Sequence, residues 1–153
     1  MQFHPIVEEW FQHTFREPTG VQPAAWDRIA SGADVLVSAP TGSGKTLAAF
    51  LHCLDRIIRQ GLDGSLEDAT QAVYVSPLKA LSNDIEKNLQ RPLEAIREIA
   101  ESRGLALPEI RIAVRTGDTP AVERQKMVQR PPHILVTTPE SFFIMLTAEK
   151  SRR

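Results

Sequence analysis

The fold of this chain is decided by one stretch, Ala39-Pro40-Thr41-Gly42-Ser43-Gly44-Lys45-Thr46. The apolar run 33–38 before it predicts a short buried strand, and the run 47–51 after it predicts a helix. A strand, a glycine-rich loop, Gly-Lys-Thr and a helix in this order are typical of a phosphate-binding P-loop. The pattern normally begins with glycine and begins here with Ala39, so the strict motif fails at one position.

The residue types in this stretch suit a nucleotide phosphate. Gly42 and Gly44 have no Cβ, so the backbone can turn tightly and close its N–H groups around phosphate oxygens. The helix that follows points the positive end of its dipole at the same anion. We expect Lys45 to reach the β- and γ-phosphates and the Thr46 hydroxyl to bind Mg²⁺. The alternative is an ordinary glycine-rich turn, and the register of Lys45 and Thr46 behind the second glycine argues against it.

Composition narrows the class of protein. The 153 residues are enough for one domain with its own core, and 42% apolar and 24% charged residues are ordinary for a globular protein. The net charge of -1 argues against a strongly basic nucleic-acid protein but leaves room for a local basic groove. A single cysteine, Cys53, predicts a buried structural thiol in a reducing, cytoplasmic compartment. No signal peptide is apparent, and no apolar run approaches the ~20 residues of a membrane span, so no membrane partner is expected.

Strands and helices are predicted to alternate along the chain. Strands are predicted at 33–38, 72–76, 110–114 and 134–137. Helices are predicted at 5–15, at 23–30, from the P-loop to a stop at Gly61, through 85 and 89 to a break at Pro92, at 93–102, at 120–129 and onward from 138–141. This order predicts an α/β fold with a mostly parallel sheet and helices on both faces. Loops that follow the strands, at 38–45, 76–79, 115–119 and 137–141, should then share one edge of the sheet.

Three of these loops have the composition of phosphate-backbone contacts. Hydroxyls, backbone N–H groups and positive charge at helix N-termini hold a nucleic-acid strand without reading its sequence. The candidate nucleic-acid-binding residues are Ser76, Pro77, Leu78, Lys79, Arg115, Thr116, Gly117, Asp118, Thr137, Thr138, Pro139 and Glu140. Ordinary turn and helix-capping chemistry is the alternative for each loop taken alone.

Gln22 is a candidate reader of the nucleotide base. Its side-chain amide carries a donor and an acceptor side by side, which complements N6 and N7 of adenine. Phe15 lies a few residues upstream and offers a face on which the base could stack. A capping glutamine is the alternative, because Gln22 stands at the entry of a predicted helix.

Taken together, these motifs resemble those of superfamily 2 helicases of the DEAD/DEAH type. The stretch 39–46 resembles motif I, 76–81 motif Ia, 115–119 the Gly-Asp loop, 137–141 motif Ib, and 15–22 the Q-motif region. The residues in these motifs are most similar to those of the Lhr (large helicase-related) family of ATP-dependent DNA helicases. The resemblance extends from about Phe3 to Leu146, nearly the whole chain.

The resemblance implies a P-loop NTPase of the RecA-like, three-layer fold. It implies ATP and Mg²⁺ as cofactors, Lys45 and Thr46 as catalytic residues, and Thr46 as the metal ligand. The nucleotide-binding residues carried over are Phe15, Gln22, Ala39, Pro40, Thr41, Gly42, Ser43, Gly44, Lys45 and Thr46. The implied partner is single-stranded or tailed duplex DNA, in a helicase with links to DNA repair.

One element of the family pattern is missing. The family places an Asp-Glu pair at a strand end to hold Mg²⁺ and position water, and we find no such pair here. We therefore expect the N-terminal portion of a first RecA-like domain, with 1–32 as the Q-motif-like lead-in and 33–147 as the P-loop units. The acidic strand, the later strands and the second RecA-like domain would belong to the remainder of a longer helicase. Alone, the chain is expected to bind ATP weakly and not to hydrolyse it.

Two further functions stay open at this stage. A non-catalytic module that binds ATP or nucleic acid is favoured by the missing acid pair. A small-molecule kinase or GTPase is disfavoured by Ala39 at the first motif position, by Gln22 upstream, and by the lack of an Asn-Lys-x-Asp guanine reader. A preference for GTP over ATP would support the second of these.

Overall fold

The computed structural model describes residues 2–77 and 85–148. The elements run in the order α1 (Pro5–Phe15), α2 (Gln22–Ala30), α3 (Lys45–Asp63), β1 (Ala72–Val75), the π-helical turn η1 (Glu86–Gln90), α5 (Arg91–Ser102), β2 (Ile112–Arg115), α6 (Ala121–Gln129), β3 (Ile134–Thr137) and α7 (Pro139–Thr147). No helix within these described residues has both the length and the apolar character needed to cross a membrane.

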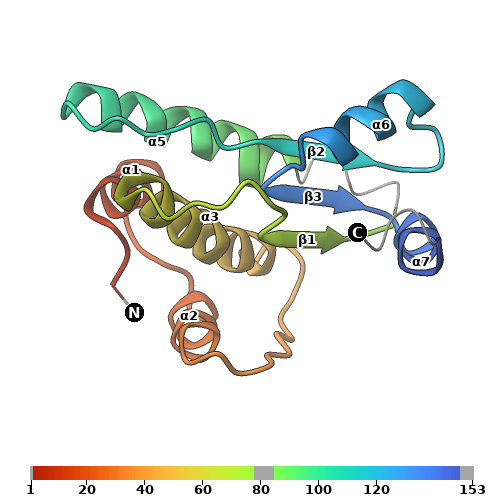
Figure 1. Cartoon of the computed structure of the whole chain (residues 1–153). Coiled ribbons are helices and arrows are strands. Elements are labelled where there is room, and N and C mark those ends of the chain that lie inside the picture. Colours follow the sequence, from red (N-terminus) through yellow and green to blue (C-terminus); the bar gives the residue numbers. More distant parts are fainter. Residues whose placement is uncertain (1, 78–84, 149–153) are drawn as a thin grey trace.

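The three strands form one parallel sheet in the order β1-β3-β2. Their arrows point the same way in Figure 1. The chain passes over β3 from β1 to β2 through α5 and returns to β3 through α6, so right-handed connections put these two helices on opposite faces. The α/β class and the parallel sheet expected from the sequence are therefore confirmed.

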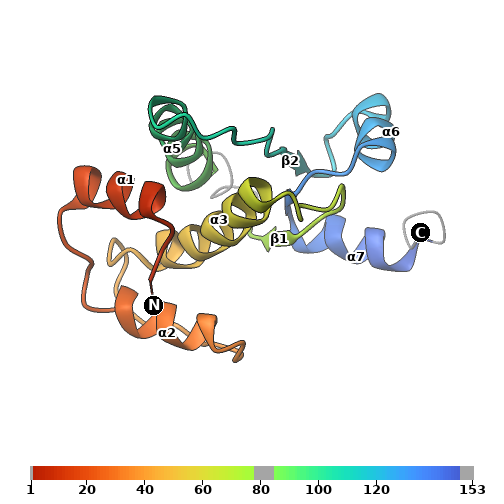
Figure 2. The ribbon, with the colours of Figure 1, turned by 60° about the vertical axis from the view of Figure 1, so that its left-hand side comes forward.

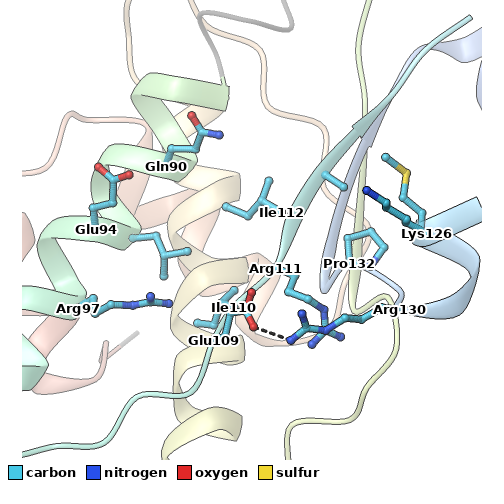
Figure 3. A pocket seen from close by; sticks show the side chains of 13 residues that line it. Gln90, Glu94, Arg97, Glu109, Ile110, Arg111, Ile112, Lys126, Arg130 and Pro132 are labelled. Atoms are coloured by element: carbon cyan, nitrogen blue, oxygen red, sulfur yellow. Dashed lines mark hydrogen bonds and ion pairs between the residues drawn. The ribbon is translucent and has the colours of Figure 1, made fainter. Parts of the chain in front are cut away.

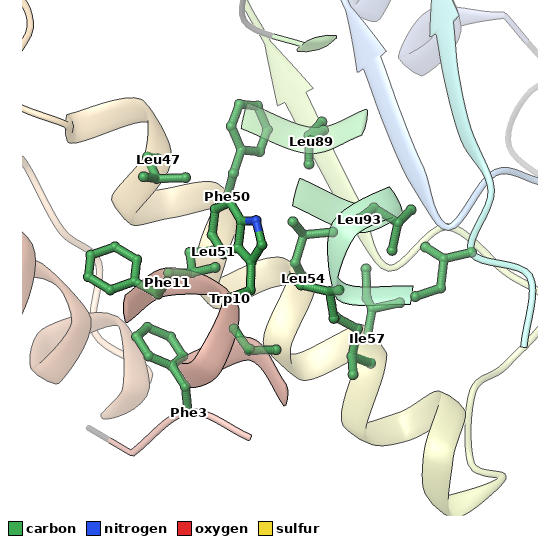
Figure 4. Close-up of a cluster of buried hydrophobic side chains, with 14 of the residues drawn as sticks. Phe3, Trp10, Phe11, Leu47, Phe50, Leu51, Leu54, Ile57, Leu89 and Leu93 are labelled. Carbon is green, nitrogen blue, oxygen red and sulfur yellow. The ribbon is translucent and has the colours of Figure 1, made fainter. Parts of the chain in front are cut away.

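Helix α3, which begins at the P-loop, is the centre of the apolar core. Leu51, Leu54, Ile57 and Ile58 are at most 1% exposed, because they share one face of the helix at a spacing of three and four residues. Figure 4 shows this face between aromatic side chains of the N-terminal segment and α1 and leucines of η1 and α5. Figures 1 and 2 show α1, α2 and α5 around α3. The core thus fixes the helix that carries the P-loop.

The N-terminal helix is tied to α3 by polar contacts as well. The backbone N–H of His4 donates to Oδ1 of Asp55 at 2.6 Å, and Nε of Arg59 donates to Oδ2 of the same carboxylate at 2.7 Å. Asp55 is only 3% exposed, so this carboxylate is buried with its charge paired. The lead-in segment therefore packs onto the P-loop helix as part of one core.

The strand predicted at 33–38 is absent from the structure. This segment carries no strand assignment, and the side chain of Leu36 is 94% exposed. A strand needs a neighbour for its backbone hydrogen bonds, and none of the described residues forms a ladder with this segment. The segment has the composition of a strand without the partner that would make it one.

Two predicted helix boundaries also differ. Helix α3 continues through Gly61 to Asp63 and is capped by Gly64, whose φ of 78° is the left-handed conformation of a helix C-cap. Gly61 has another reason to lack a side chain, because a Cβ there would lie 2.9 Å from Cγ of Pro108. Pro92 marks a change from the π-helical turn to α5, since proline has no N–H and displaces the preceding carbonyls. The part of that helix predicted before Ile85 lies outside the described residues.

Candidate nucleotide and nucleic-acid site

The P-loop has the backbone conformation that its glycines predict. Gly42 and Gly44 have φ of 82° and 83°, in the left-handed region that favours glycine. Gly44 is the residue before α3, so the free N–H groups of the first turn of α3 open onto the loop. The backbone N–H of Ser43 donates to the carbonyl of Pro40 at 3.3 Å and closes the turn. This geometry is suited to an anion.

The side chain of Lys45 reaches back over this loop. Its ammonium donates to the carbonyl oxygen of Pro40 at 2.7 Å and to that of Ala39. The hydroxyl of Ser43 is buried and has no hydrogen-bond partner within the described part of the chain. A buried hydroxyl without a partner is costly, so a ligand oxygen that accepts from Ser43 would stabilise the loop. The residues present therefore fit a phosphate group beside the half-buried Lys45 and Thr46.

Gln22 is buried against the P-loop with only 3% of its surface exposed. Its Oε1 accepts from the backbone N–H of Thr19 at 2.9 Å, and its Nε2 donates to the carbonyl of Gly44 at 3.3 Å. Thr19 makes a second link, because its hydroxyl donates to the carbonyl of Ser43 at 2.7 Å. The turn before α2 is thus joined to the P-loop by the side chains of Thr19 and Gln22, which stand at the two ends of this turn.

Phe15 lies at the end of α1 and remains 46% exposed. Its ring packs at 5.8 Å from Trp10 and 5.3 Å from Phe11, measured between ring centroids. One side of the ring is therefore held by the aromatic cluster of α1, and a large fraction of it stays accessible.

The register of the sheet brings three of the predicted loops together. Val75 and Arg115 both pair with Thr137, so β1, β2 and β3 end at the same level. The backbone N–H of Ser76 donates to the carbonyl of Thr137 at 3.0 Å, and the Thr137 hydroxyl donates to the carbonyl of Arg115 at 2.7 Å. We call these three strand ends and the loops after them, residues 75–77, 115–119 and 137–141, the rim. The strand ends lie beside α7 in Figure 1. Leu78 and Lys79 lie outside the described residues.

The P-loop is positioned by α3 and not by a strand of this sheet. The ring of Phe50, in the second turn of α3, lies 4.6 Å from the ring of Tyr74 in β1, measured between centroids. This contact attaches the start of α3 to the first strand of the rim. The predicted strand 33–38, which would have placed the loop directly, pairs with no strand in the described parts of the chain, 2–77 and 85–148.

Several rim hydroxyls serve the fold itself. Thr137 is fully buried, and Thr138 is 5% exposed and caps α7 by accepting from the backbone N–H of Ser141. Thr119, also buried, accepts from the backbone N–H of Thr116 at 2.8 Å. The rim residues with exposed surface are Pro77, Gly117, Asp118, Pro139 and Glu140. The turn and capping chemistry expected as the alternative is thus present at Thr116 and Thr138, whereas the Thr137 hydroxyl links two strands.

The rim also has a positive side. Burial lowers the pKa of the Arg115 guanidinium, and the nearby charge of Arg124 lowers it further. Arg124 is exposed on α6 and was not among the residues predicted from the sequence.

Thr19, which contacts the P-loop, was also not predicted as a site residue. It stands three residues before Gln22 in a Pro-Thr-Gly turn, and this turn is the signal in the sequence that could have indicated it.

Comparison with known proteins assigns the chain to a family. The family model described as DEAD/DEAH box helicase matches residues 19–153. The chain belongs to the DEAD/DEAH box helicase family. Curated relatives include the ATP-dependent helicase Lhr-Core of Methanothermobacter thermautotrophicus, 56% identical over 97% of this chain and 17% of that relative. The Lhr helicase/uracil glycosylase of Escherichia coli is 47% identical over 95% of this chain and 10% of that relative.

Solved structures show the same relationship. The helicase Lhr of Mycobacterium smegmatis, determined with ssDNA and AMP-PNP, is 49% identical and superposes with a TM-score of 0.85 over 97% of this chain and 18% of that one. The DUF1998 helicase MrfA is 23% identical with a TM-score of 0.73, which supports the fold. The RecA-like fold expected from the sequence is thus confirmed. The chain spans less than a fifth of the length of the three Lhr relatives named above.

Proposed function

We propose that this chain forms the N-terminal portion of the first RecA-like domain of an ATP-dependent DNA helicase. In this proposal it binds ATP with Mg²⁺ at the P-loop and single-stranded DNA at the rim. The observation that carries it is the P-loop itself, with two left-handed glycines, Lys45 folded over the loop, and the N-terminus of α3 behind it. The relatives are named as ATP-dependent helicases, which supports ATP as the nucleotide.

The protein groups around the nucleotide have separate roles in this proposal. The N–H groups of the loop and the first turn of α3 hold phosphate oxygens, and the Ser43 hydroxyl supplies one more donor. Lys45 exchanges the carbonyl of Pro40 for the β- and γ-phosphates, and the Thr46 hydroxyl serves as a ligand of Mg²⁺. When bound, Mg²⁺ neutralises charge on the phosphates. Thr41 and the carbonyls of Ala39 and Pro40 complete the wall of the loop.

Gln22 is proposed to select adenine while it stays attached to the P-loop. A glutamine amide has two N–H donors and two acceptor lone pairs, and the contacts to Thr19 and Gly44 use one of each. The remaining donor and lone pair match N7 and N6 of adenine, with the accessible face of Phe15 available for stacking. Gln22 would then contact the base and the P-loop at the same time, so that binding of adenine is coupled to the position of the loop.

Replacing Lys45 with alanine is expected to weaken ATP binding by at least about tenfold, since a charged hydrogen bond to phosphate is worth roughly 1.5–3 kcal/mol. Fluorescence anisotropy of a labelled ATP analogue measures the dissociation constant. Arg56→Ala is the matched control, because Arg56 is an exposed cation on the same helix outside the loop. Equal loss of binding in both variants, or tighter binding of GTP than of ATP, would contradict the assignment.

ATP hydrolysis by this chain alone is not proposed. No Asp-Glu pair follows any strand in the described part of the chain, so that part supplies no carboxylate pair at a strand end to hold Mg²⁺ and orient water. The same observation favours the second candidate function, a module that binds ATP or nucleic acid without turnover. Phosphate release by the pure chain that disappears in Lys45→Ala would contradict both this point and the second candidate.

The rim is proposed to hold the backbone of single-stranded DNA. Arg115→Ala is expected to weaken binding of a dT oligonucleotide and of oligonucleotides of other base sequences by the same severalfold factor. It should also reduce the slope of log K against log salt by about 0.7, the value for one phosphate contact on a single strand. Anisotropy titrations over a salt series measure both quantities. Lys126→Ala, which removes a cation on α6 away from the strand ends, is the control. A loss confined to one base sequence, or an unchanged slope, would contradict a backbone contact at Arg115.

A further inference from the structure

A cavity of about 630 Å³ lies between α5, β2 and α6, away from the P-loop and the rim. Figure 3 shows it, with side chains of α5 on one side of β2 and side chains of α6 on the other. The segment that lines it, 109–113, leads into the start of β2, whereas the rim lies at the carboxyl end of this strand. The cavity is therefore separate from both surfaces of the proposed function.

The cavity surrounds the free edge of β2. Ile112 and Ala113 both line it, although neighbouring residues of a strand face opposite sides of the sheet, so the cavity extends around the edge of the strand. Among the strands of the described residues, β2 pairs only with β3. The carbonyl of Arg111 accepts from the backbone N–H of Ile134 at 3.1 Å, and in a parallel ladder this turns the N–H and C=O of Ile112 away from β3. One backbone donor and one acceptor thus face the cavity.

Both sides of this edge carry positive charge without a partner. On the α5 side, Arg97 is half-buried, and its Nε is buried with no hydrogen-bond partner in the described structure. On the α6 side, Lys126 forms no ion pair with any described residue. The other two cations of the lining are paired, Arg130 with Glu109 at 2.6 Å and Arg111 with Asp68. The lining thus carries four cations against two carboxylates, Glu94 and Glu109, and one cation on each side of the strand edge has no partner among the described residues.

The floor between these charges is apolar. Leu93 of α5 is 7% exposed, Ile110 is 5% exposed, and Ile112 is half-buried. Met127 of α6 lines the opposite side. A ligand for this cavity needs backbone hydrogen-bonding groups, apolar side chains and negative charge on both of its faces. An extended peptide has these properties, since its successive side chains point alternately to the two faces.

We propose that the edge of β2 binds an acidic, extended segment of a partner protein, which adds a strand to the sheet. The backbone of the segment pairs with Ile112, and adjacent acidic side chains reach Arg97 on one face and Lys126 on the other. A second copy of this chain is a poor occupant, because it would bring the same unpaired cations to the contact. Strand addition at an exposed sheet edge is a general mode of peptide recognition, with affinity from the main chain and selectivity from side chains.

The test is an anisotropy titration of the 153-residue chain with a fluorescein-labelled peptide of valines and threonines around two adjacent glutamates. We expect saturable binding that is independent of ATP. Lys126→Glu should raise the dissociation constant by at least about tenfold, because it places like charges opposite each other. Arg124→Glu is the matched control, since it changes the net charge equally on the same helix outside the cavity lining, and its effect should stay within about twofold.

Peptide variants separate the backbone contribution from charge. A peptide with lysines in place of the glutamates should not bind, and one with N-methyl groups on alternate amides should bind at least about tenfold more weakly, because it cannot donate to the strand. Equal binding of either peptide would overturn the proposal. Three other outcomes would also overturn it. Displacement of the peptide by millimolar phosphate would indicate an anion site, and a self-association that Lys126→Glu abolishes would indicate a second copy of the chain. Binding of a dT oligonucleotide that Lys126→Glu weakens as much as Arg115→Ala does would indicate that the cavity is part of the nucleic-acid face.

Discussion

Replacing Trp26 with alanine is expected to lower the free energy of unfolding by about 3–5 kcal/mol, the usual cost of truncating a buried aromatic side chain. The indole of Trp26 is 5% exposed and lies 4.8 Å from the ring of Phe3 and 5.5 Å from that of Phe11, both edge to face. Its Nε1 donates to the carbonyl of Ala48 at 3.0 Å. The side chain therefore joins α2 to the N-terminal segment, to α1 and to the P-loop helix.

Urea unfolding followed by far-ultraviolet circular dichroism measures this loss. Trp26→Phe is the control, because it keeps an aromatic ring in the cluster and removes only the indole N–H and part of the volume. We expect it to cost about 1–2 kcal/mol, of which the lost hydrogen bond accounts for roughly 0.5–1.5. A Trp26→Ala variant that unfolds within about 1 kcal/mol of the parent would show that α2 is not part of the same cooperative core.

Elements with strong local signals were predictable from the sequence. Helix α1 begins at Pro5 and ends at Phe15 as predicted, because proline suits the first turn and Ile6, Val7 and Trp10 share one buried face. Strand β3 also has its predicted bounds, Ile134–Thr137, since two prolines end the preceding helix and the run that follows is short and rich in β-branched residues, which favour strands. In both cases the information lies within the element itself.

Features that depend on distant partners were not predictable. The run 33–38 has the composition of a buried strand, but composition does not supply the neighbouring strand that would pair with it. Gly61 reads as a helix stop, whereas its role is to admit Pro108 from a segment far along the chain. Glycine serves both purposes equally well, and only the tertiary structure distinguishes a capping glycine such as Gly64 from a packing glycine.

The candidate site divides in the same way. The P-loop is a local motif of consecutive residues, so the sequence alone was enough to predict Lys45 and Thr46 as phosphate- and Mg²⁺-binding residues. The attachment of Gln22 and Thr19 to this loop joins residues more than twenty positions apart, and no local pattern encodes it. The cavity at the edge of β2 depends even more on residues far apart in the sequence. Its walls come from α5, β2 and α6, and its charge follows from which of its cations lack a partner among the described residues.

Gly44→Ala is expected to disrupt the site more strongly than Gly42→Ala, although the two glycines have nearly the same φ, 83° and 82°. Both substitutions force an L-residue into the left-handed region, at a cost of roughly 1–2 kcal/mol. At Gly42 a new Cβ meets nothing within 4 Å, whereas at Gly44 it would lie 2.5 Å from Nε2 of Gln22. The second alanine must therefore also displace the glutamine that ties the lead-in segment to the P-loop.

A double-mutant cycle isolates this contact. We expect Gly44→Ala to exceed Gly42→Ala by about 1–3 kcal/mol in the free energy of unfolding, the usual cost of overpacking, and to weaken the ATP analogue further. In a Gln22→Ala background the two alanine substitutions should become nearly equal, because the clashing amide is gone while the strain remains. If Gly44→Ala and Gly42→Ala are equivalent with Gln22 in place, the glutamine is mobile at the loop, and it would then contribute to adenine binding without holding the P-loop in its shape.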